Sequence, residues 1–241
     1  MTIDEMRESL LSAPKNGYAD MTAQQRQEME SYCKRYAAFM DACKTEREAT
    51  SWAVKVAEEH GFKALQPGCK LQPGDKVYKD NRGKSIMLAV IGSKSLNDGA
   101  NICAAHVDSP RMDLKPNPLY EDGEISYFKT HYYGGIKKYQ WTAVPLAIHG
   151  VVYRKDGSVI TVTVGEDDND PIFYVSDLLI HLSADQMKKS LAEGIVGEQL
   201  NVILGTEPLQ GEGADLVKLH VMKLLNEKYG LIEEDFLTAE L

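Results

Sequence analysis

His106 and Asp108 are the residues whose types and spacing best suit metal chemistry. They end an apolar run that starts at Asn101 and predicts a buried strand, and open α/β sheets bind ligands beyond the carboxyl ends of their strands. Residues two apart in a strand point to the same face, so both side chains would project together. A neutral imidazole is a common zinc ligand, and a nearby carboxylate can accept the other ring N–H and fix the tautomer. The pair suits a metal ligand with its orienting group, or a hydrogen-bonded histidine and a turn-capping aspartate before Pro110.

Further metal ligands are sparse in the sequence. It has no HExxH pattern, and we expect structural roles for His60, His149 and His220. The four cysteines form no CxxC pair, which favours reduced thiols over a disulfide framework or a zinc knuckle. A zinc site usually needs three or four protein ligands. A metal site at His106 must therefore be completed by groups from elsewhere, or not exist.

Motifs of other chemistries are absent from the sequence. It contains no GxSxG pattern for a serine nucleophile, no GxGxxG for a dinucleotide and no GxxxxGK[ST] for a nucleotide phosphate. Without these patterns, the sequence gives no support to serine hydrolase, Rossmann or P-loop chemistry.

The segment 127–141 interleaves aromatic and basic residues around Gly134-Gly135. Such a segment could stack bases and contact phosphates, as single-strand binders do. It could instead form a substrate or subunit contact, because aromatic residues are enriched in interfaces. The third interpretation is a hairpin whose aromatic side chains pack into a core.

The composition is that of a globular protein. The 241 residues include 27 Lys and Arg against 36 Asp and Glu, a net charge of −9, and 43% are hydrophobic. The apolar fraction excludes an intrinsically disordered chain, and the negative charge disfavours nucleic acids and anionic membranes as partners. No apolar window is long enough for a membrane span, and the N-terminus has no secretory signal pattern. We expect a cytoplasmic protein.

The first part of the chain has the pattern of an α/β fold. Apolar spacing predicts a helix over 23–43, and the capping box of Thr45 and Glu48 predicts a second helix that ends at Gly61. The near-continuous apolar runs 85–92 and 101–108 predict central strands covered on both faces.

The chain beyond residue 113 is expected to be β-rich, with two helices. Alternating β-branched residues around Asp156-Gly157 predict a hairpin. A helix is expected from Ser183 to Gly194, because Ser183 and Gln186 fit a capping box. The other expected features are a connection over 115–124, strands over 125–133 and 141–154, a helix over 214–229 and a strand over 236–241.

Two long stretches carry a specific resemblance. AHVDSPRMDLKPNPLYEDGEISYFKTHYYGGIKKYQW and PIFYVSDLLIHLSADQ resemble the M18 metalloaminopeptidases, the aspartyl aminopeptidase and aminopeptidase I group. The final DFLTAEL resembles the strand that leads back into the family's catalytic domain. The resemblance runs through almost the whole chain, with 1–18 the least informative.

The resemblance implies a cytoplasmic exopeptidase that acts on peptides with two metal ions, usually zinc, with cobalt or manganese as other candidates. It implies an α/β catalytic domain interrupted by a β-rich dimerisation domain, in subunits that form a homo-oligomer, a tetrahedral dodecamer. Mapped on this chain, residues 1–113 would begin the catalytic domain, 114–235 would be the inserted domain, and 236–241 would return to the first.

The resemblance also assigns residues. His106 would be the first metal ligand, Asp108 the acidic residue that orients it, and His181 a residue that reaches a neighbouring subunit's active site. The family is roughly twice this length, and its other ligands and general-base glutamate would lie beyond Leu241. We therefore expect this chain to be an incomplete, inactive part of an aminopeptidase. The alternatives are a non-catalytic binding or assembly module and a protein that binds RNA or a single nucleic-acid strand.

Overall fold

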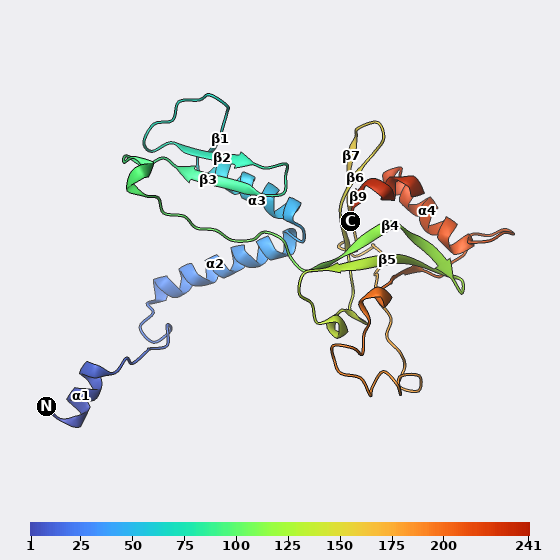
Figure 1. Cartoon of the computed structure of the whole chain (residues 1–241), viewed down its shortest axis with the longest axis horizontal. Coiled ribbons are helices and arrows are strands. Elements are labelled where there is room, and N and C mark those ends of the chain that lie inside the picture. Colours follow the sequence, from blue (N-terminus) through green and yellow to red (C-terminus); the bar gives the residue numbers. More distant parts are fainter. The chain divides into compact units, whose positions relative to one another are not determined.

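The computed structural model describes residues 1–241 in two compact units, Met1–Cys43 and Lys44–Leu241 (Figure 1). The first unit holds helices α1 (Ile3–Leu10) and α2 (Ala23–Ala42), and α2 confirms the helix predicted there. Each begins with a capping box, formed by Thr2 and Glu5 in α1 and by Thr22 and Gln25 in α2. The threonine hydroxyl accepts a hydrogen bond from the backbone N–H of the second residue, whose side chain accepts one from the threonine backbone N–H. No helix in the structure combines the length and apolarity that a membrane crossing requires.

The second unit begins with helix α3 (Glu46–Glu59) on a three-stranded sheet. The predicted capping box is present: Thr45 Oγ1 accepts from the Glu48 backbone N–H at 3.3 Å, and Glu48 Oε2 accepts from the Thr45 N–H at 2.9 Å. The helix ends before Gly61, whose φ of +82° suits glycine. The sheet comprises β1 (Lys63–Ala64), β2 (Lys76–Asp80) and β3 (Ile86–Val90).

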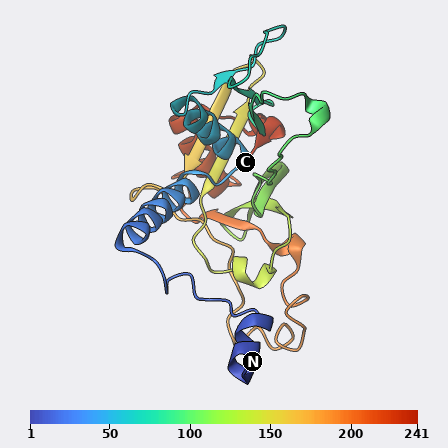
Figure 2. The same ribbon diagram turned by 90° about the vertical axis from the view of Figure 1, so that its left-hand side faces the viewer.

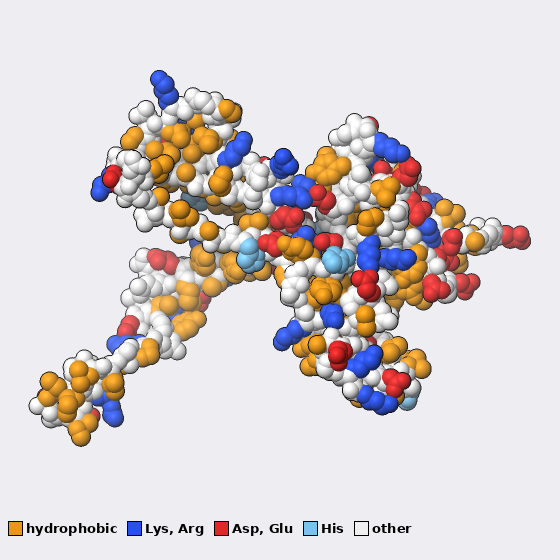
Figure 3. Space-filling model, in the orientation of Figure 1, with side chains coloured by type: hydrophobic (Ala, Val, Ile, Leu, Met, Phe, Trp, Pro, Cys, Tyr) orange, Lys and Arg blue, Asp and Glu red, His pale blue; other side chains and the backbone are white.

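The two runs predicted as buried central strands are not buried. β3 forms, but it pairs antiparallel with β2, and Met87 and Val90 are 71% and 61% exposed. Residues 101–108 form no strand at all and are almost entirely exposed. Figure 3 shows hydrophobic side chains at the surface over this sheet. A continuous apolar run predicts a strand covered on both faces, and nothing within Lys44–Leu241 supplies the second cover.

The next sheet contains β4 (Arg111–Asp122), β5 (Ile125–Tyr133) and β8 (Val202–Gly205), all antiparallel. The prediction of a connection over 115–124 was wrong, because most of that stretch belongs to β4. Its two prolines fall at a register shift between Leu114 and Leu119, where Asn117 has a φ of +54°. Proline is tolerated at such an irregularity because no ladder N–H is needed there.

A third sheet is built on the predicted hairpin, which the structure confirms. β6 (Ile148–Tyr153) and β7 (Val159–Val164) are joined through Asp156-Gly157, and Asp156 Oδ1 accepts from the Ser158 N–H at 2.9 Å. β9 (Ala239–Glu240) pairs with β6 at the end of the chain. The strand expected over 236–241 is shorter than predicted, because a 3₁₀ turn occupies Glu233–Thr238.

The core lies between the second and third sheets and helix α4 (Leu216–Tyr229), which confirms the last predicted helix. Figures 1 and 2 show α4 beside the β6–β7 hairpin, and the Tyr229 hydroxyl donates to the Thr163 carbonyl oxygen at 2.7 Å. Phe128 and Phe236 meet edge to face, with centroids 5.3 Å apart. The most deeply buried hydrophobic side chains are Val152, Leu200, Val217 and Leu231.

The helix expected from Ser183 to Gly194 is absent. The segment consists of turns, and the Ser183 hydroxyl donates to the Ile180 carbonyl oxygen at 3.1 Å rather than capping a helix. The described structure contains three further 3₁₀ turns, Leu96–Asp98, Lys138–Trp141 and Gly197–Gln199.

Candidate functional site

His106 lies in the irregular segment between β3 and β4, with 82% of its side chain exposed. Its Nδ1 donates to the backbone carbonyl oxygen of Asp108 at 2.8 Å and lies 3.4 Å from Asp108 Oδ1. A carbonyl oxygen can only accept, so Nδ1 carries the hydrogen and a neutral ring has its lone pair on Nε2. The ring is thereby prepared to bind an electrophile through Nε2.

Asp108 is held in its ionised form by a neighbouring strand. Its Oδ2 accepts a hydrogen bond from the Tyr133 hydroxyl at 3.0 Å. This bond, together with a backbone N–H bond, lowers the pKa of Asp108, and the same contact raises the pKa of Tyr133. At neutral pH the carboxylate therefore stays charged beside the imidazole.

This region offers a metal ion one imidazole, which Asp108 contacts on its Nδ1 side. Within residues 1–241, no three His, Cys, Asp or Glu side chains are grouped closely enough to hold a metal ion together. The donor type fits zinc best, since a neutral imidazole with a fixed tautomer is a common zinc ligand, whereas manganese favours oxygen donors. His106 thus fits one coordination position.

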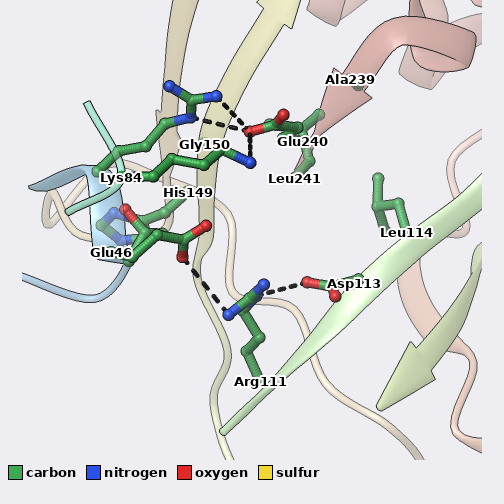
Figure 4. Close-up of a pocket in the computed structure, with 12 residues that line it drawn as sticks. Glu46, Lys84, Arg111, Asp113, Leu114, His149, Gly150, Ala239, Glu240 and Leu241 are labelled. Atoms are coloured by element: carbon green, nitrogen blue, oxygen red, sulfur yellow. Dashed lines mark hydrogen bonds and ion pairs between the residues drawn. The ribbon is translucent and has the colours of Figure 1, made fainter. Parts of the chain in front are cut away.

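A second polar cluster lines a cavity of about 230 Å³ between α3, β4, β6 and β9 (Figure 4). Glu240 accepts from Arg47 at 2.6 Å and pairs with Lys84 at 3.0 Å. Arg111 bonds Asp113 through Nε at 2.6 Å and lies 3.5 Å from Glu46. Each of these cations faces a carboxylate, so the cluster connects α3 to β4 and β9 and has no unpaired charge among them to attract a ligand.

His149 bridges two carboxylates beside this cavity. Its Nδ1 is 2.8 Å from Glu48 Oε1 and its Nε2 is 2.8 Å from Glu166 Oε1. Both nitrogens can donate only in the imidazolium form. The hydrogen bond to Glu48 and, more weakly, the one to Glu166 raise the pKa of His149. They outweigh burial, which alone would lower that pKa. Burial would raise the pKa of Glu48, but hydrogen bonds from His149 and from the backbone outweigh it and lower that pKa.

We expect the His149 bridge to make stability depend on pH. A raised folded-state pKa gives stability that is full below the unfolded value, about 6.5, and is lost as pH rises through the folded value. The lowered pKa of Glu48 acts at the other end, where stability is lost as pH falls through that value. His149→Gln should therefore reduce the free energy of unfolding by about 1–2 kcal/mol at pH 6 and by much less at pH 9. Urea titration across this pH range measures the difference.

His220→Gln is the matched control for this experiment, because the His220 ring hydrogen-bonds a backbone carbonyl oxygen, that of Glu207, and forms no ion pair with a carboxylate. The loss of unfolding free energy should depend on pH in His149→Gln and should be nearly independent of pH in His220→Gln. A deficit in His149→Gln that stays constant from pH 6 to pH 9 would contradict the bridge.

Comparison with known proteins decides the family. The family model for the aminopeptidase I zinc metalloproteases (M18) matches residues 39–241. This chain belongs to the M18 family. The "Probable M18 family aminopeptidase 1" of Clostridium acetobutylicum is 48% identical over 241 residues, which cover 98% of this chain and 52% of that protein. The chain therefore spans about half the length of the curated relatives it matches.

Solved M18 structures agree with the fold. The crystal structure of the M18 aminopeptidase of Thermotoga maritima superposes with a TM-score of 0.87 at 42% identity, over 95% of this chain and 50% of that one. Aminopeptidase I of Clostridium acetobutylicum gives 0.84 at 46% identity, over 96% and 52%. The resemblance recognised in the sequence is thus confirmed, and the structure resembles M18 aminopeptidases in its helices and small sheets.

His181 lies apart from the His106–Asp108 pair in its contacts, since no hydrogen bond or ion pair joins it to either residue. It sits in the turn-rich segment before Ser183 and is exposed. Its apolar neighbours Leu179, Ile180 and Leu182 are 70%, 65% and 69% exposed. In this M18 chain the segment therefore presents a run of large apolar side chains to the surroundings.

The structure supports the core interpretation for part of the aromatic segment 127–141. Phe128 is buried in the core, and Tyr127 stacks on Tyr120 with ring centroids 5.1 Å apart. Tyr132 and Tyr133 are 37% and 41% exposed at the end of β5. Sequence reasoning missed the contact of Tyr133 with Asp108. The available signal was the position of Tyr133 at the end of a predicted strand, directly before Gly134-Gly135.

Proposed function

We propose that the whole protein is a metal-dependent aminopeptidase that releases N-terminal amino acids from peptides. The observation that carries the proposal is the His106 ring, whose Nδ1 donates to Asp108 and whose Nε2 lone pair is left available, in a chain of a zinc metalloprotease family. His106 would hold the metal through Nε2, and Asp108 would fix the ring's tautomer and orientation.

Bound metal ions, two per subunit and zinc before cobalt or manganese, would polarise the scissile carbonyl and lower the pKa of a water molecule. The relatives are about twice as long as this chain. We place the remaining ligands and a general-base glutamate in the part of such a protein that lies outside these residues. On this proposal the 241-residue chain alone binds metal weakly and has no peptidase activity.

The proposed domain organisation has residues 1–113 and 236–241 in the catalytic domain and 114–235 as an inserted β-rich dimerisation domain. The proposal is supported by the ion pairs of Glu240. This residue follows 114–235 in sequence, yet it pairs with Arg47 of α3 and with Lys84, which both precede that stretch. These contacts join residues before and after 114–235, as the proposed organisation requires.

We further propose a cytoplasmic homo-oligomer, a dodecamer by the family resemblance, in which His181 of one subunit reaches the active site of a neighbour. The support is the exposed apolar run around His181, because contiguous apolar surface of this kind marks interaction sites. There His181 would stabilise the substrate's carbonyl oxygen as negative charge develops on it.

Metal removal tests the proposed function. Treatment of the whole protein with a chelator should reduce release of p-nitroaniline from aminoacyl p-nitroanilides by at least about 100-fold, because the Lewis acid supplies several kcal/mol. Zinc, cobalt or manganese should restore the rate, and the 241-residue chain should show no turnover.

Full activity after chelation, or robust turnover by the 241-residue chain, would contradict the proposal. A whole protein that binds no metal and hydrolyses no peptide would favour the binding or assembly module instead.

A further inference from the structure

We propose that Tyr133 is a positioning residue for His106 and acts on it through Asp108. The inference rests on the proposed function, because it concerns how this chain presents its metal ligand. Nothing in the sequence near His106 indicates Tyr133, which lies 25 positions after Asp108 and reaches it only in the fold.

The segment that carries His106 has little else to hold it. Residues 100–110 make no backbone hydrogen bond to any other part of Lys44–Leu241, and they belong to no sheet. The bonds between His106 and Asp108 are internal to the segment. Within Lys44–Leu241, the Tyr133 hydroxyl is the one hydrogen-bond donor from another element that reaches this segment, at 3.0 Å from Asp108 Oδ2. The bond is charge-assisted, which makes it stronger than a neutral one.

Tyr133 is itself well fixed. It is the last residue of β5 and pairs with Arg111 in the β4–β5 ladder. The Arg111 guanidinium carbon lies 4.3 Å from the centre of the Tyr133 ring, and Arg111 is held by Asp113 at 2.6 Å. A sheet residue with a fixed ring can place its hydroxyl within the tolerance that a metal ligand's support requires.

Gly134 adds a second contact between the end of β5 and this segment. Its φ is +80°, and a Cβ built there would lie 3.5 Å from Pro110 Cα. The strand end therefore approaches the backbone just after Asp108 while Tyr133 bonds the aspartate itself. Together they position Asp108, whose backbone carbonyl oxygen accepts the hydrogen bond from His106 Nδ1 and whose Oδ1 lies 3.4 Å from the same nitrogen.

The test is Tyr133→Phe in the whole protein, because phenylalanine removes the hydroxyl and keeps the ring beneath Arg111. Zinc affinity is measured by competition with a chromogenic chelator, alongside melting temperature and peptidase activity. We expect about 10-fold weaker zinc binding, the lower end of the effect of outer-shell partners. Tyr132→Phe is the matched control, since the Tyr132 ring stacks on His131 instead, and it should change affinity less than twofold.

A double-mutant cycle shows whether Tyr133 acts through Asp108. In an Asp108→Ala background, Tyr133→Phe should weaken zinc binding no further. Unchanged affinity in Tyr133→Phe, or a further 10-fold loss in the Asp108→Ala background, would overturn the inference while leaving the proposed function intact. The cycle also decides the case in which Tyr133→Phe lowers the melting temperature, because a general destabilisation would persist without Asp108. A wild-type protein that binds no zinc would overturn both.

Discussion

Replacement of His106 by alanine in the whole protein is expected to reduce kcat/KM for aminoacyl substrates by about a thousandfold or more. The variant would lose one imidazole ligand, so less metal would bind and its geometry would change. The several kcal/mol by which the metal lowers the activation barrier would then be partly lost. Because His106 is 82% exposed and lies outside any helix or strand, the melting temperature should change little. Steady-state kinetics and elemental analysis of bound zinc measure the two effects together.

His220→Ala is the matched control for His106→Ala. It also removes a histidine whose Nδ1 donates to a backbone carbonyl oxygen, here a half-buried one on helix α4. Its activity and zinc content should stay close to wild type. Retention of both zinc and activity by His106→Ala would remove His106 from the metal site and the proposed mechanism with it.

His181→Ala is expected to lower kcat by about 100-fold while zinc content and assembly stay unchanged. Loss of one donor to a developing oxyanion has an effect of this size. The distinctive prediction concerns mixed oligomers, since His106 and His181 of one site would come from different subunits. Two inactive variants, His106→Ala and His181→Ala, should regain activity when they are dissociated and reassembled together.

The regained activity arises because one subunit supplies an intact His106 and its neighbour an intact His181. Mass analysis of the mixed oligomers confirms that the variants have combined. If mixed oligomers form and no activity returns, the two histidines do not share a site across subunits. An active His181→Ala protein would equally contradict the role.

The contact between His106 and Asp108 was predictable because the two residues are close in sequence. His106 and Asp108 are two residues apart, and their contact depends on local backbone geometry. Contacts between residues far apart in the sequence were not predictable in this way. Tyr133 reaches Asp108 through the pairing of β4 with β5, and the His149–Glu48 bridge joins residues 101 positions apart. No local pattern encodes such distances.

By itself the sequence determined the elements whose ends are set by local chemistry. A capping box sets the start of α3, and Gly61 follows its end. Asp156-Gly157 sets the turn of the β6–β7 hairpin. Each feature depends on hydrogen bonds and dihedral angles of residues only a few positions apart. Only the tertiary structure decided that 101–108 is not a strand, that β4 runs through two prolines and that Ser183 caps no helix. These outcomes depend on which partner each segment meets, since a strand needs a neighbour for its backbone groups and an apolar run needs a second face for burial.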